Sequence, residues 1–276
     1  MNKLAILVAS TLFFAACQSS VEVRLERARE LSFAGQSKEA AAEYGALLTL
    51  LEGAESNERN DAAKVETLAR LGDLRYLTLR DYRGAADAYR RLIREAPASE
   101  EAWAAREKLA DLSRRFFDDL NEAIAQWQAL AASGRPDADR FSYLVAKSYF
   151  ELQDYEQSRK ECNDLAARHP DSKWAADALF LLGTAWQFEG KHAESIPVFE
   201  EIEQRWPTSE FAPRARFQIG QSQLALEDPE SALASYLEAL KRHPDPQTVQ
   251  AEIQRARRHL SEAVRLEARA KAGFRG

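Results

Sequence analysis

A repeat with a period of 37 residues constrains the fold of this chain more than any other feature of its sequence. Three consecutive segments, which begin at Phe141, Ala178 and Ala215, align without gaps. Four columns run through them: a small residue, a second small residue, a large residue (once replaced by cysteine) and a proline. In order, these are Ala146, Gly183 and Gly220; Ser158, Ser195 and Ala232; Cys162, Phe199 and Tyr236; and Pro170, Pro207 and Pro244. A fixed period of this size indicates an array of stacked structural units.

Three looser copies precede these segments, so the sequence predicts about six units. They are marked by Ala28, Gly35, Ala40 and Tyr44; by Gly72, Ala85, Tyr89 and Pro97; and by Leu120, Ala123, Trp127 and Pro136. The first and second copies are further apart than the others, and the polar stretch "EGAESNERND" predicts a loop in the excess.

The columns predict that each unit is a pair of helices. Apolar residues recur at spacings of three and four before and after the polar stretch "FEGKHAE", as amphipathic helices require. Small residues let two helices approach closely, and the large residue fills the space beside them. Each proline ends a second helix, since proline lacks an amide proton and disfavours helical backbone at the preceding residue. Ser99, Ser172 and Ser209 are predicted to cap the helix that follows.

These columns resemble the tetratricopeptide repeat, with its Leu-Gly, Ala, aromatic and Pro positions. The longer period predicts nearly one added turn at the start of each first helix. Together with joints such as Pro170-Asp171-Ser172, it is similar to periplasmic envelope proteins such as BamD and the Tol-Pal-associated YbgF (CpoB). The resemblance implies an all-α tetratricopeptide-repeat superhelix (α-solenoid) of about six helix hairpins over residues 22–244. The amphipathic segment that follows predicts a capping helix and tail over residues 245–276.

The N-terminus resembles the signal of a bacterial lipoprotein. Lys3 precedes an apolar run, Leu4 to Ala16, whose helical length of about 20 Å is too short for the roughly 30 Å core of a bilayer. The residues Phe14-Ala15-Ala16-Cys17 resemble the lipobox. This resemblance implies that residues 1–16 are removed, that Cys17 is acylated, and that residues 17–21 form a short tether. Gln18, where Asp would signal retention, implies the outer membrane, with the body in the periplasm.

No catalytic, cofactor-binding or metal-binding constellation is present, so the sequence does not predict an enzyme. The phosphate-binding pattern GxxxxGK is absent, and the four histidines form no ligand cluster. Ser158 and Ser195 occupy a packing column, and Cys162 is predicted to be a buried thiol. A net charge of −6 argues against a nucleic-acid partner. The basic C-terminal segment is typical of the solvated face of a last helix.

The resemblance also implies that the first helices line a concave groove that binds partner proteins. Groove positions recur opposite the packing stripe in three copies. They are Arg140, Tyr143, Lys147 and Phe150; Asp177, Phe180, Thr184 and Gln187; and Arg214, Phe217, Gln221 and Leu224. The aromatic column Tyr143, Phe180 and Phe217 predicts a binding surface, since rigid aromatics near Arg and Lys are enriched in hot spots. That the column only packs adjacent repeats is an equally good interpretation.

By resemblance, the expected function is that of a non-catalytic adaptor at the outer membrane. Its partners would be envelope proteins or their peptide and helical segments, in outer-membrane protein insertion, Tol-Pal and cell-wall coordination, or assembly of a pilus secretin. Two alternatives stay open: a scaffold without a lipid anchor, in the periplasm or the cytoplasm, and an enzyme acting on the cell wall. An enzyme of that kind would need paired carboxylates in one pocket, whereas the acidic residues here are scattered over helix faces.

Overall fold

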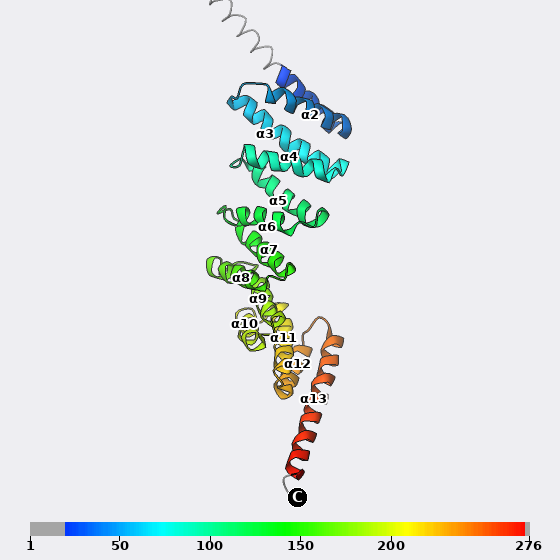
Figure 1. The fold of residues 1–276 in the computed structure, drawn as a ribbon, viewed down its shortest axis with the longest axis vertical. Coiled ribbons are helices and arrows are strands. Elements are labelled where there is room, and N and C mark those ends of the chain that lie inside the picture. The colour runs from blue at the N-terminus through cyan, green and yellow to red at the C-terminus, as the bar shows by residue number, and fades with distance from the viewer. Residues whose placement is uncertain (1–19, 274–276) are drawn as a thin grey trace, which may run out of the picture. The chain divides into compact units, whose positions relative to one another are not determined.

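The structure is a computed structural model that describes residues 20–273 of the chain, with side chains as far as residue 266. Over that range it contains helices and turns and no strand. The chain divides into two compact units, with the boundary between Leu130 and Ala131. Figure 1 labels helices of both units. The predicted all-α class and the succession of helix hairpins are confirmed.

The first unit contains three hairpins. A helix described from residue 20 to residue 33 pairs with α2 (Ser37–Glu52). The second hairpin is α3 (Glu58–Asp73), continued by the π-helix η1 (Leu74–Leu79), with α4 (Tyr82–Glu95), and the third is α5 (Glu100–Phe116) with α6 (Leu120–Ala131). Residues 20 and 21, assigned above to the tether, already belong to the first helix, and Val21 is only 3% exposed. The signal segment 1–16 and Cys17 lie outside the described residues.

The second unit contains three further hairpins and one last helix. The hairpins are α7 (Ala138–Glu151) with α8 (Tyr155–Arg168), α9 (Ala175–Phe188) with α10 (His192–Arg205), and α11 (Phe211–Ala225) with α12 (Pro229–Leu240). The last helix, α13 (Pro246–Gly273), packs against α12 through Val249, Ile253 and Ala256. The residues before two repeat prolines, His169 and Trp206, leave the helical region at φ near −133° and −132°, so α8 and α10 end at the proline as predicted. The prediction is wrong for α12, which ends at Leu240, four residues before Pro244.

The small and large columns form the core of each hairpin. Phe199 and Tyr236 are fully buried, and each ring lies over the glycine of the first helix. A Cβ atom added to Gly183 would lie 2.6 Å from Cζ of Phe199, and one added to Gly220 would lie 2.6 Å from Cε1 of Tyr236. Glycine is therefore required at these two positions because a ring occupies the space of its missing side chain.

Neighbouring hairpins are also joined by a hydrogen bond that the sequence did not predict. Arg205 donates to the carbonyl oxygen of Pro170 at 3.1 Å, and Arg242 donates to that of Pro207 at 2.9 Å. Donor and acceptor both advance by one period, so the same contact recurs at successive joints. The proline carbonyl lies just after the end of a helix, and the arginine side chain supplies its hydrogen-bond donor. Both hydrogen bonds are exposed to solvent.

Two details of the sequence prediction are wrong at the joints between hairpins. Ser99 does cap α5, since its side chain accepts from the amide of Ala102. Ser172 and Ser209 are not caps, because α9 and α11 begin later, at Ala175 and Phe211. The extra residues of the longer period form a turn after the proline instead of an added helical turn.

The predicted loop "EGAESNERND" is shorter in the structure than in the sequence interpretation. Helix α2 ends at Glu52, and Asn57 already caps α3 by accepting from the amide of Asn60. The four residues from Glu58 onward are therefore helical. Part of the excess length is taken up by η1, whose π-helical turns accommodate additional residues before the turn.

All six hairpin turns contain one residue in the left-handed region, at Gly35, Arg80, Asp118, Gln153, Gly190 and Glu227. This conformation costs a residue other than glycine about 1–2 kcal/mol. Part of that cost is offset in a comparison with glycine, because glycine loses more conformational freedom on folding.

We expect Glu227→Gly to raise the free energy of unfolding by about 1 kcal/mol and Gly190→Ala to lower it by a similar amount. No atom lies within 4 Å of a Cβ added at Gly190, so no side-chain clash contributes to the change that urea denaturation measures for this variant. Equal signs for the two changes would contradict this explanation.

Candidate partner-binding surface

The predicted groove residues lie together on one face of the second unit. We call them the first-helix face: Arg140, Tyr143, Lys147 and Phe150 of α7, Asp177, Phe180, Thr184 and Gln187 of α9, and Arg214, Phe217, Gln221 and Leu224 of α11. Helix α9 contacts both α7 and α11. All these side chains are half-buried except Phe217, which is 7% exposed.

The aromatic column packs successive helices against each other. Tyr143 stacks on Trp174, with ring centroids 5.2 Å apart and planes 17° from parallel. Phe180 lies 5.8 Å from Phe211, which occupies the position of Trp174 one period later. Phe217 contacts His243 at 5.1 Å between centroids. Each ring thus contacts the joint that follows it, and the column contributes to stability whatever else it does.

Charged groups from three helices meet on this face around Asp177. Burial raises the pKa of its carboxyl group, an effect that Glu210 reinforces and that Arg214 and Lys147 oppose. The guanidinium carbon of Arg214 lies 5.0 Å from the ring centre of Phe180, a cation–π geometry. Burial likewise raises the pKa of Tyr143 to about 12. Lys147, Asp177 and Arg214 therefore form a charged patch that stands on a packed aromatic base.

Other predicted groove residues are occupied by contacts within the unit. Thr184 donates to the carbonyl of Phe180 at 2.7 Å, and Gln187 donates to the hydroxyl of Ser222 at 2.8 Å. Phe150 packs on Phe188 near the end of α7, with centroids 5.3 Å apart. Lys147 and Gln221 are half-buried like the others, but neither makes a side-chain hydrogen bond or an ion pair among the described residues, which leaves their polar groups available to another molecule.

The first unit has a cavity on its own first helices that the sequence analysis missed. It has a volume of about 550 Å³ and lies between α3, α4 and α5. Its lining includes Glu66, Arg70, Asp73, Tyr89, Glu101 and Lys108. Asp73 accepts from Lys108 and, at 2.7 Å, from the hydroxyl of Tyr89. The first helices here carry no equivalent of the aromatic column Tyr143, Phe180 and Phe217. The sequence could have indicated these residues only through an alignment of the second copy with the later copies at Gly72 and Tyr89.

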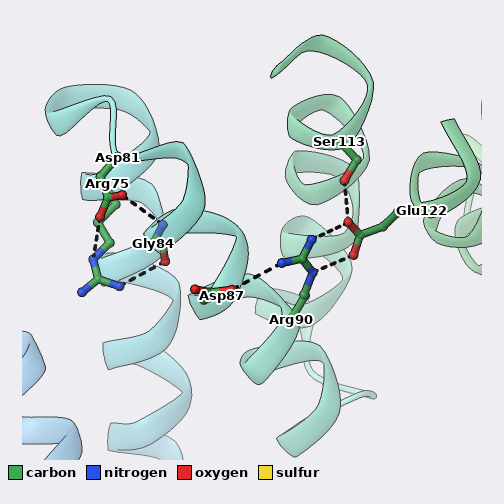
Figure 2. A network of polar contacts seen from close by, with 7 residues as sticks. All are labelled: Arg75, Asp81, Gly84, Asp87, Arg90, Ser113 and Glu122. Carbon is green, nitrogen blue, oxygen red and sulfur yellow. Dashed lines mark hydrogen bonds and ion pairs between the residues drawn. The ribbon is translucent and has the colours of Figure 1, made fainter. Parts of the chain in front are cut away.

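A second polar cluster in the first unit joins its hairpins. Arg90 of α4 makes two parallel hydrogen bonds to Glu122 of α6, at 2.7 and 2.6 Å, and Ser113 of α5 donates to the same carboxylate at 2.9 Å (Figure 2). The bidentate geometry is the strongest form of such a pair. The hydrogen-bonding groups of Arg90, Ser113 and Glu122 find their partners within the chain. We therefore infer that this network stabilises the fold and does not bind a ligand.

The Glu122 network predicts a pH dependence of stability. The hydrogen bond from Arg90, helped by Ser113, lowers the pKa of Glu122 although burial opposes it. A lowered pKa means that the contribution is complete above the unfolded pKa of about 4.3 and is lost as the pH falls through the lower folded value. We expect Glu122→Gln to reduce the free energy of unfolding by about 1–2 kcal/mol at pH 7 and by less at pH 3.

The matching measurement is urea denaturation of wild type and variant across that pH range. Only their difference is informative, because burial raises the pKa of other acids, such as Asp177 and Glu203, and these respond to acid in the opposite direction. A difference that is the same at pH 7 and pH 3 would contradict the assignment.

The described residues offer few other chemical features. Among them, no group of three or more His, Cys, Asp or Glu residues is placed to hold a metal ion. None of the helices in that range is both long and apolar enough to cross a membrane. Cys162 is fully buried, as predicted, and burial raises the pKa of its thiol to about 12.

Comparison with solved structures places this architecture among known folds. MamA shares 19% sequence identity, with a TM-score of 0.52 over 66% of this chain and 92% of MamA. YrrB, a tetratricopeptide repeat protein with an unusual peptide-binding site, shares 15% identity, with a TM-score of 0.50 over 68% of this chain and 91% of YrrB. The Naa15/Naa10 complex bound to HypK gives 17% identity and a TM-score of 0.67, over 96% of this chain and 39% of the other. At these identities the likeness shows the fold alone.

Family models agree with the repeat columns. Models of the tetratricopeptide repeat match residues 66–99, 113–173, 177–209 and 214–246, which together make up more than half of the chain. No curated protein matches the sequence. The matched segments contain the small, large and proline columns that build the hairpins. The chain belongs to the tetratricopeptide repeat family.

Proposed function

We propose that this protein is a non-catalytic adaptor that binds segments of other envelope proteins on its first-helix face while an acylated Cys17 holds it at the outer membrane. The fold is that of a scaffold for protein–protein interaction. The related repeat protein YrrB is described as having a peptide-binding site, which supports the same role here. The repeat period and the proline joints resemble those of BamD and YbgF, which favours a role in the cell envelope like that of these proteins.

The observation that carries the proposal is the charged patch of Lys147, Asp177 and Arg214. Three successive first helices contribute one residue each, so an extended or helical segment lying across them would meet all three. The patch carries two positive charges and one negative charge, and the guanidinium group of Arg214 stacks on the ring of Phe180. A partner segment with acidic side chains spaced across the helices fits this arrangement.

The anchor part of the proposal rests on the sequence around Cys17. Only residues 18 and 19 separate Cys17 from the helix that is described from residue 20. Val21 is part of the hydrophobic core of the first unit, so that core reaches to within four residues of Cys17 along the sequence. An acylated Cys17 would therefore hold the first hairpin next to the membrane surface.

Reversal of one charge on the first-helix face tests the binding part of the proposal. We expect Lys147→Glu to weaken the capture of envelope proteins by about fivefold or more, a loss typical of an interface hot spot. Lys160→Glu is the matched control, because Lys160 of α8 is exposed and the substitution changes the charge by the same amount. Quantitative affinity purification of both variants from envelope extracts provides the measurement. Equal recovery of partners by the two variants would contradict binding at this face.

A further inference from the structure

The hairpin turns of the second unit carry exposed apolar side chains that the proposed function does not use. Leu152, Phe188 and Leu226 stand at the ends of the three first helices and are 41%, 64% and 48% exposed. The ring of Phe188 packs on Phe150 and Tyr155, with centroids 5.3 and 5.6 Å away. The rings support one another and still leave most of Phe188 in water. We call Leu152, Phe188 and Leu226, with the acidic residues named next, the turn edge.

Exposed carboxylates follow each of these apolar residues within six positions of the sequence. Those of the turn edge are Glu156, Glu194, Glu227 and Glu230. None of the four is engaged in an ion pair within the described part of the chain. Three of them lie in the first turns of α8, α10 and α12, where the helix dipole favours a negative charge. The helix dipole therefore stabilises the charges of these three carboxylates, and none of the four carboxylates is neutralised by an ion pair.

The second half of α13 has the opposite character. The helix has 28 residues, compared with 15 in α11, and after Ala256 its side chains are no longer buried. Arg257, Arg258 and Arg265 are exposed and have no ion-pair partner among the described residues, and Val264 is 60% exposed. Residues seven apart lie on nearly the same side of a helix, so Arg257 lies beside Val264 and Arg258 beside Arg265. The far end of α13 runs beyond α12 in Figure 1.

From this complementarity we infer that the second half of α13 docks on the turn edge of a second copy of the chain. The guanidinium groups of Arg257, Arg258 and Arg265 face the four free carboxylates, and Val264 covers apolar surface at Phe188 or Leu226. Both surfaces belong to the second unit, and within one copy α13 packs on α12. The contact is therefore heterologous, with each copy offering its helix to the next. It uses hairpin-turn residues and not the first-helix face, so its failure would leave the proposed function intact.

Two charge-reversal variants of the full chain in mild detergent test this contact by sedimentation velocity. Glu194→Lys with Glu227→Lys alters the turn edge alone, and Arg258→Glu with Arg265→Glu alters the helix alone. We expect the wild type to self-associate at about 0.05 M salt and to dissociate at about 0.5 M, where screening shortens the reach of the charges. Each variant alone is expected to associate at least tenfold more weakly.

Mixing the two variants gives the decisive result. The first variant keeps an intact helix and the second keeps an intact edge, so the mixture is expected to form a one-to-one complex. This outcome also shows that both variants are folded. Placing all four substitutions in one chain restores opposite charges and is expected to restore self-association. The inference is overturned by a wild type that stays monomeric at low salt, by variants that associate as the wild type does, or by a mixture that does not pair.

Discussion

Replacing Gly183 with alanine is expected to lower the free energy of unfolding by about 1–3 kcal/mol. The new methyl group would lie within 3 Å of three ring atoms of Phe199, which is fully buried, so the ring would have to shift within the core. Alanine is the better helix former by about 1 kcal/mol, but the clash outweighs that gain. Truncation of the ring from the other side, Phe199→Ala, leaves a large cavity and is expected to cost about 3–5 kcal/mol.

Gly45 provides the matched control for this prediction. It lies inside α2, and no atom stands within 4 Å of a Cβ added there. Gly45→Ala is therefore expected to raise stability by about 0.5–1 kcal/mol, which is the opposite sign for the same chemical change. Urea denaturation followed by circular dichroism measures all three variants. If Gly183→Ala proves as stable as wild type, the close contact between helix and ring does not hold the hairpin together.

Replacing Cys17 with alanine is expected to abolish lipid labelling and to remove the protein from the outer-membrane fraction. Three acyl chains, as in the lipoproteins whose signal this N-terminus resembles, exceed the two signals that stable anchoring requires, since each buried CH2 contributes about 0.8 kcal/mol. The chain has only one other cysteine, so Cys162→Ala is a precise control: Cys162 is buried in α8, and its loss should leave the label in place. The measurement combines metabolic labelling with radioactive palmitate and separation of membranes by density.

The opposite result would change the proposed location. If the Cys17→Ala protein keeps its label, another group carries the lipid and the anchor proposal is wrong. If the wild type is never labelled, the adaptor acts without an anchor, and the proposal about the first-helix face stands by itself.

The hairpins could be predicted from the sequence because their packing repeats with it. Gly183 and Phe199, or Gly220 and Tyr236, are each one small and one large residue at fixed spacing, and their contact is the core of the hairpin. In the fourth hairpin Ala146 and Cys162 occupy these columns, so a larger first residue accompanies a smaller second one. The pattern therefore records complementary volumes, which is why it remains recognisable when the residue types change.

The joints between hairpins could not be predicted in the same way. Ser172 and Ser209 satisfy the sequence rule for caps, yet the turn after each proline displaces the start of the helix. Pro197 lies inside α10, where the rule for proline would have ended the helix. The bonds from Arg205 and Arg242 to proline carbonyls depend on main-chain positions that only stacked hairpins define.

Partner binding at the first-helix face stays a prediction, but the placement of its residues can be compared with the structure. Helical spacing was sufficient to place its residues on one face of α7, α9 and α11. Spacing could not show that Tyr143, Phe180 and Phe217 would each find a ring in the following joint, because those contacts join residues about thirty positions apart. The charged patch of Lys147, Asp177 and Arg214 could not be predicted from spacing either, because it depends on how the three helices lie side by side.

A photo-crosslinking residue placed at Gln221 in living cells tests the central claim most directly. Gln221 lies on the first-helix face and is half-exposed, while Lys160 on α8 provides a control position on a second helix. The proposed function predicts that Gln221 forms a covalent adduct with a discrete envelope protein and that Lys160 does not. An adduct of equal yield from Lys160, or adducts from Lys160 alone, would contradict partner binding at the first-helix face.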